Sequence, residues 1–146
     1  MFKKEWVYKK GSTILIDTHI HLDNKAYFDD IDDVIKNALN LGVKKFIIPG
    51  ADINDLPRAI ELSEKYAEVF FAVGIHPYDI DSYDEKYLEK FINHKKCVAN
   101  GECGLNYFRL PEDEDEKNSK YKTSKRSFYL SNKVSKKIQK TTYYTY

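Results

Sequence analysis

Residues 16–23, IDTHIHLD, place two histidines on alternate positions at the end of an apolar run. The run over residues 13–17 is typical of a buried strand. Because side chains alternate along a strand, His19 and His21 are expected to project from the same face. Imidazole nitrogens bind Zn, Mn, Fe or Ni, and a nearby carboxylate would complete a site. The stretch predicts either part of a metal site or two ordinary polar residues at a strand end.

Three more short apolar runs predict strands, at residues 46–49, 69–74 and 97–99. Apolar residues at helical spacing predict helices over about 31–41, 56–67 and 85–92. This alternation predicts an α/β fold with parallel strands and right-handed crossovers. A whole (β/α)8 barrel needs ~250 residues, so the favoured fold is the N-terminal half of a TIM-type barrel, truncated after about four βα units. The alternative is a small doubly wound sheet of flavodoxin type.

Two more residues at predicted strand ends carry groups suited to catalysis. His76 follows the third strand, and Glu102 follows the fourth. The carboxyl ends of parallel strands meet at one rim, where both side chains would join His19 and His21. A carboxylate there can bridge two divalent ions that hold a phosphodiester. A structural loop histidine and a solvated glutamate are the plainer alternatives, but the convergence favours a catalytic rim. His94 is expected on the opposite rim, at an ordinary polar helix end.

Composition indicates one domain in a reducing compartment. The first twelve residues lack the apolar core of a signal peptide, and no run reaches the ~18 apolar residues of a membrane span. Two cysteines, Cys97 and Cys103, do not make a disulfide framework, so a cytoplasmic location is expected. Cys103 follows an acidic residue, so a nucleophilic thiol with a lowered pKa is not expected. The sequence contains no glycine-rich phosphate loop of Walker or dinucleotide type.

Charge divides the chain near residue 117. Of its 24 Lys and Arg residues, 16 lie in residues 1–117 together with all 23 Asp and Glu residues, and eight lie in residues 118–146 with no acid. Ordinary globular sequence mixes charge signs. Residues 1–117 are therefore predicted to form the half barrel, and residues 118–146 a basic, disordered tail. The alternative is an appendage that contacts nucleic acid through cations and aromatic stacking.

Three ordered motifs, IDTHIHLD, VGIHP at residues 73–77 and GECGLNYFR at residues 101–109, resemble the TatD family of metal-dependent deoxyribonucleases. The resemblance covers about residues 13–117 and implies an amidohydrolase-like (β/α)8 barrel. It further implies that His19 and His21 bind one divalent ion, that Glu102 bridges two as the catalytic carboxylate, and that His76 lies in or beside the substrate site. The implied cofactors are Mg, Mn or Zn ions and the implied substrate is DNA.

The resemblance has local departures and a larger one. Asn100 stands where the family usually has an apolar residue, and Asn106 where it usually has Asp. After residue 117 the family continues with a helix and a strand ending Pro-Leu-Ile-Ile-His, which this chain lacks. When residues 125–145 are back-translated with A/T-leaning codons and the bases are read one position later, they yield KEVFISQIKLAKKYKKPLIIH. This peptide has the pattern of a helix followed by that strand. The hypothesis is that residues from about 117–124 onward are translated out of frame.

The expected product is a truncated TatD-type enzyme that is weakly active or inactive. Two other classes stay open: a non-catalytic nucleic-acid-binding module that uses the basic, tyrosine-rich tail, and a metal-dependent amide or ester hydrolase, for example one that deacylates D-aminoacyl-tRNA. No membrane partner and no obligate protein partner is expected. The exposed edge of a half barrel predicts that self-association is possible.

Overall fold

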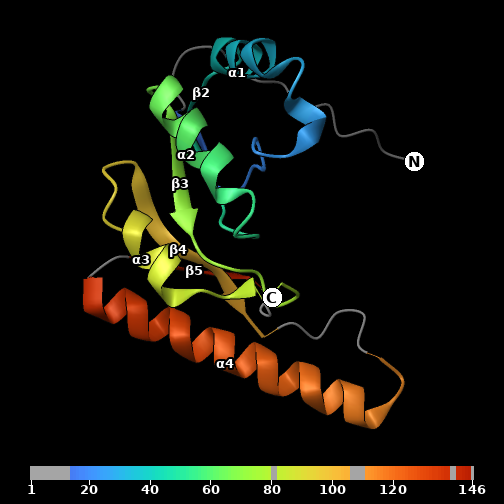
Figure 1. Cartoon of the computed structure of the whole chain (residues 1–146). Helices are drawn as coiled ribbons and strands as arrows, with labels where there is room; N and C mark the ends of the chain where they lie inside the picture. The colour runs from blue at the N-terminus through green and yellow to red at the C-terminus, as the bar shows by residue number, and fades with distance from the viewer. Residues whose placement is uncertain (1–13, 80–81, 106–110, 139–140, 146) are drawn as a thin grey trace.

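The computed structural model describes residues 14–79, 82–105, 111–138 and 141–145 (Figure 1). Within them, one parallel sheet has the strand order β1-β2-β3-β4-β5, with one α-helix between each successive pair. The elements are β1 (Leu15–Asp17), η1 (Lys25–Tyr27), α1 (Ile31–Asn40), β2 (Val43–Ile48), α2 (Leu56–Lys65), β3 (Val69–Val73), α3 (Glu85–Phe91), β4 (Cys97–Gly104), α4 (Glu114–Ile138) and β5 (Thr141–Thr145). Two residues that the sequence analysis names, Thr13 at the predicted start of the first strand and Asn106 in the third motif, lie outside the described residues.

Strands that neighbour one another in chain order are the arrangement of a TIM-type barrel, whereas a doubly wound sheet reverses direction at a switch point. The order from β1 to β5 therefore confirms the predicted half barrel, and the flavodoxin-type alternative is wrong. Four βα units are present, as predicted, and β5 extends the sheet by one strand.

The core lies between the sheet and its helices. Phe46 and Ile48 of β2, and Phe71 and Val73 of β3, are at most 1% exposed and pack with the apolar faces of the helices. Alternate residues of a strand share a face, so these four side chains point to the helical layer. The predicted helices are confirmed to within two residues at each end, because an apolar stripe marks each of them.

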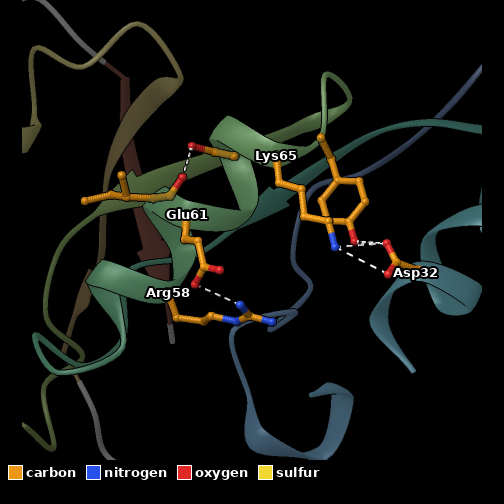
Figure 2. Close-up of polar contacts among 7 residues, drawn as sticks. Asp32, Arg58, Glu61 and Lys65 are labelled. Carbon is orange, nitrogen blue, oxygen red and sulfur yellow. Dashed lines mark hydrogen bonds and ion pairs between the residues drawn. The ribbon is translucent and has the colours of Figure 1, made fainter. Parts of the chain in front are cut away.

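A polar contact joins α1 to α2 on the outer surface (Figure 2). Lys65 Nζ lies 3.1 Å from the Asp32 carboxylate, and the Tyr66 hydroxyl donates a hydrogen bond to the same group. Both donors lower the pKa of Asp32. Arg58 and Glu61 form a separate pair at 2.8 Å one turn apart on α2. Exposed pairs of this kind add little stability, so the buried apolar side chains hold the helices in place.

The prediction of a disordered tail over residues 118–146 is wrong for the residues that the structure describes. Residues 118–138 belong to α4, which lies along β4 in Figure 1, and residues 141–145 form β5, which pairs in parallel with β4. None of the described helices, α4 included, is both long and apolar enough to cross a membrane. The out-of-frame origin of these residues stays a prediction.

The composition of the buried face of α4 explains why hydrophobic periodicity does not predict this helix. Four serines of α4 are each at most 6% exposed: Ser124, Ser127, Ser131 and Ser135. Among the described side chains of α4, Val134 is the only apolar one that is buried. A search for apolar residues at helical spacing finds no stripe here. Asn100 of β4 uses this polar face: its amide donates to the Ser131 carbonyl at 2.6 Å and to the Ser135 hydroxyl at 3.1 Å.

Replacing Ser127 with alanine is expected to stabilise the chain by about 1 kcal/mol. The Ser127 hydroxyl is fully buried and has no hydrogen-bond partner among the described residues, and an unsatisfied buried hydroxyl costs about 1–3 kcal/mol. Urea unfolding followed by circular dichroism measures the change. The matched control is Ser131→Ala, which is expected to be neutral or destabilising because the Ser131 side chain hydrogen-bonds with Cys103. A lower urea midpoint for Ser127→Ala would contradict the prediction.

Candidate metal site

The exit of β1 is held by contacts that bring His19 and His21 together. The Asp17 carboxylate accepts a hydrogen bond from the His19 backbone N–H at 3.1 Å, and the Ile20 N–H donates to the Ile47 carbonyl at 3.2 Å. The two imidazole rings lie 5.2 Å apart between centroids, nearly edge to face. Leu22, the next residue, is fully buried and anchors the turn.

Glu102 reaches the same place through glycine contacts between strand ends. The Gly50 N–H donates to the Gly101 carbonyl at 2.9 Å, and the Glu102 N–H donates to the Gly50 carbonyl across the end of β3. A Cβ atom on Gly74, which follows β3, would lie 2.3 Å from the Gly101 carbonyl carbon. The three glycines therefore let the backbones after β2 and β3 approach β4 closely enough to fix Glu102.

An irregularity in β4 decides which way Glu102 points. Strand alternation would place Asn100 and Glu102 on the same face. Instead, the register shifts between Asn100 and Cys103, and Gly101 has a φ of 150°. Asn100 and Cys103 both contact Ser131 of α4, whereas Glu102 faces His19. The prediction that Glu102 follows the strand is also corrected, because β4 continues to Gly104.

His19, His21 and Glu102 form one cluster. The His19 Nε2 lies 3.5 Å from the Glu102 Oε1, and each residue offers one ligand atom within 4.8 Å of the others. Within the described ranges this is the group of three such residues whose spacing suits a metal ion. The Glu102 side chain is 6% exposed and that of His19 is 43% exposed, so the cluster is anchored on one side and open to solvent on the other.

The electrostatics of the cluster suit a cation. Burial lowers the pKa of His21, which keeps its imidazole neutral, and a metal ion binds only a neutral imidazole. Burial raises the pKa of Asp23 to about 6, and the nearby Asp55 and Glu102 carboxylates add to the rise. The Asp23 Oδ1 lies 3.9 Å from the His21 Nδ1 and has no hydrogen-bond partner among the described residues. A cation would relieve this repulsion between carboxylates.

Sequence reasoning missed Asp55. It stands directly before α2 and looks like an ordinary helix N-cap, but its side chain makes no capping hydrogen bond to the helix. Its charge instead raises the pKa of Asp23 and acts on His21. Its position in the loop after β2, at the rim where the other strands end, was the available signal.

His76 lies on the same rim, near His21 but outside the cluster of three ligands. Its backbone N–H donates to the Ala51 carbonyl at 2.8 Å, and its Nδ1 accepts from the Tyr78 N–H at 3.2 Å. The ring stacks on Tyr78 with centroids 5.3 Å apart. The contacts fix the ring beside the cluster, and the substrate-binding role implied by the resemblance stays a prediction.

His94 takes no part in this arrangement. It lies between α3 and β4, at the amino end of the sheet, with its Nε2 3.3 Å from Glu64 Oε1 and its ring 5.4 Å from that of Phe71. This is the ordinary polar position that the sequence predicts.

Cys103 is expected to resist alkylation in the native chain. Burial raises the pKa of its thiol to about 11, so the thiolate fraction at pH 8 is about 0.001, against about 0.2 for an exposed thiol. The folded state holds this proton more tightly than the unfolded chain, so the stability it contributes is intact at neutral pH and is lost as pH rises through about 11. Ellman's reagent on a Cys97→Ala variant, with and without urea, measures the difference. Fast native labelling would contradict it.

The family model described as TatD related DNase matches residues 16–142 of the chain. A relative from Bacillus subtilis, named an uncharacterized metal-dependent hydrolase YabD, is 36% identical over 105 residues, covering 68% of this chain and 41% of the relative. TatD of Salmonella typhimurium, named a 3′-5′ ssDNA/RNA exonuclease, is 28% identical over 107 residues, covering 69% and 41%.

Solved structures agree on the fold. The crystal structure of YjjV, a TatD homologue from Escherichia coli, matches with a TM-score of 0.74 and 25% identity, covering 88% of this chain and 49% of YjjV. A TatD family hydrolase from Entamoeba histolytica matches with a TM-score of 0.61 and 26% identity, covering 88% and 55%. The chain thus spans about two fifths of the length of the curated relatives. The match over residues 16–142, together with the rim geometry, shows that the chain belongs to the family of TatD-related DNases.

Proposed function

We propose that the chain carries the metal-binding part of a hydrolase that cleaves phosphodiester bonds in DNA. The observation that supports this most directly is the convergence of His19 and His21, from the segment after β1, with Glu102 of β4. Two imidazole nitrogens and one carboxylate oxygen are ligands that divalent transition ions accept. Relatives named metal-dependent hydrolase and ssDNA/RNA exonuclease add support for the reaction class.

Each side chain has a role in this proposal. His19 and His21 would bind one ion, and Glu102 would be shared between two. A bound divalent ion polarises a phosphoryl oxygen and lowers the pKa of a water molecule. Asp23, whose carboxylate lies 3.9 Å from the His21 Nδ1, would orient that ring. His76 would contact the substrate from the adjacent strand end.

The three ligands also determine which metal ion and what rate of hydrolysis are expected. Imidazole favours Mn or Zn over Mg. Two imidazoles and a carboxylate can hold one ion, but a second ion would share only Glu102 among these three. We therefore expect one tight ion, and weak hydrolysis by this chain.

The test is cleavage of a labelled single-stranded oligonucleotide with Mn²⁺, Mg²⁺ or EDTA. Slow cleavage is expected with Mn²⁺, and its loss is expected in EDTA and in a His19→Ala variant. The matched control is His94→Ala, which removes a histidine remote from the site and should leave the rate unchanged. Equal cleavage by the His19→Ala variant would refute the assignment. Metal-dependent hydrolysis of a D-aminoacyl ester, with the oligonucleotide left intact, would assign the site to ester chemistry instead.

A further inference from the structure

The exposed face of α4 carries a band of five cations and one tyrosine, which we name the basic stripe. Its members are Lys122, Lys125, Arg126, Tyr129, Lys133 and Lys136, all exposed. With 3.6 residues per turn, these six positions fall within an arc of about 100°, and the four buried serines lie on the opposite side of the helix. Because the serine side packs on β4, the basic stripe faces away from the sheet.

The cations of the basic stripe are not neutralised within the part of the chain that the structure describes. Residues 118–138 contain no Asp or Glu, and no described carboxylate lies within ion-pair distance of these five cations. Among the acids at the start of α4, Glu114 pairs with Lys117 at 3.0 Å, and the Asp113 carboxylate accepts hydrogen bonds from backbone N–H groups of the first turn. Five cations on one helix face, without an ion-pair partner among the described residues, repel one another, so the surface favours an anionic partner.

We propose that the basic stripe binds single-stranded nucleic acid. From Lys122 to Lys136 the helix rises about 21 Å, the length of about six nucleotides of a stacked strand at ~3.4 Å each. Tyr129 lies midway and is 68% exposed, so its ring is available to stack on a base while the flanking cations contact phosphates. An aromatic ring in line with cations suits bases joined by phosphates better than it suits an acidic protein.

An anionic membrane fits this surface less well. An interfacial helix needs an apolar face to insert beside its cations. On α4 the face opposite the cations is buried against β4, and the exposed large apolar side chains among its described residues are Phe128 and Tyr129. Single-stranded nucleic acid therefore explains more of the observations than an anionic membrane does.

The amino end of α4 lies near the candidate metal site, although the basic stripe faces away from it. Lys120 lies on the side of α4 that carries the buried serines, and its ammonium lies 5.4 Å from the centre of the Tyr78 ring, which stacks on His76. The inference goes beyond the proposed hydrolase, because binding by the basic stripe needs neither a metal ion nor Glu102.

The test is fluorescence anisotropy with a labelled oligothymidylate of about 12 nucleotides, twice the length of the stripe, in EDTA over a range of salt. The stripe variant is K125Q/R126Q/K133Q. Its control, K36Q/K44Q/K95Q, removes the same charge from exposed lysines elsewhere. The stripe variant is expected to lower the magnitude of the slope of log affinity against log salt by about 2, at ~0.7 per lost phosphate contact. The control is expected to leave it unchanged.

A second variant, Tyr129→Ala, keeps the charge and is expected to weaken binding roughly fivefold or more through lost stacking. Circular dichroism checks that each variant keeps its helix. Equal losses in the stripe variant and its control would overturn the proposal, as would binding to phosphatidylserine vesicles without binding to the oligonucleotide. Because every measurement is made in EDTA, failure of the proposed hydrolase would leave these outcomes unaffected.

Discussion

Replacing Glu102 with glutamine is expected to lower the affinity of the chain for Mn²⁺ or Zn²⁺ by at least about 100-fold. The substitution keeps the shape of the side chain but removes the negative charge that lies 3.5 Å from His19. Loss of residues that only support a metal ligand commonly costs 10–100-fold in affinity, so loss of an anionic ligand itself should cost at least the upper value. Isothermal titration calorimetry on the metal-free chain measures the change.

Two matched variants separate ligand loss from general damage. Glu64→Gln removes the same charge near His94, at the opposite end of the sheet, and should leave metal affinity unchanged. His19→Ala should match the loss seen with Glu102→Gln, because both residues belong to the same cluster. If Glu102→Gln binds the ion as tightly as the parent chain, the assignment of Glu102 as a ligand is wrong.

Replacing Gly74 with alanine is expected to destabilise the chain by about 3 kcal/mol or more, near the upper end of overpacking costs. The new Cβ would lie 2.3 Å from the Gly101 carbonyl carbon and 2.5 Å from its oxygen. These are backbone atoms, so no side chain can rotate away and the strand ends must separate. Because Gly101 precedes Glu102, metal affinity should fall together with the free energy of unfolding. Urea unfolding and calorimetry test the two effects.

The control for this variant is Gly42→Ala. Gly42 follows α1 with a φ of 106°, so alanine there costs about 1–2 kcal/mol of backbone strain. Gly42 lies far from the metal ligands, at the amino end of β2, so this variant should lose some stability without losing metal affinity. Comparable losses of stability at both positions would mean that the contact between the strand ends is looser than the structure indicates.

Much of the fold could be predicted because its signals are local. Apolar stripes mark α1 and α2, and the short runs around Phe46 and Phe71 mark central strands. Hydrophobic periodicity did not predict α4, because its buried face consists mostly of serines, two of which accept hydrogen bonds from the Asn100 amide of β4. A helix whose packing face is polar carries no periodic signal, and only its neighbour reveals it. The end of β4 was also misplaced, because Asn100 and Glu102 are polar although both are buried.

The candidate site divides in the same way. The residue types and the rim were predictable, since parallel strands bring their carboxyl ends to one edge. The direction of Glu102 was not, because it depends on the shift in register at Gly101. Asp55 was missed because its capping position hides its effect on Asp23.

By itself, the sequence determined the parallel α/β architecture, the helices with apolar stripes, and the histidines at the end of β1. Hydrophobic periodicity and strand alternation act over a few residues, so they can be read along the chain. Only the tertiary structure decided that α4 and β5 join the sheet, that Glu102 faces His19, and that the cations of α4 align on its outer face. These depend on contacts between residues far apart in the chain, such as Gly50 with Gly101 and Asn100 with Ser131, which have no local sequence signal.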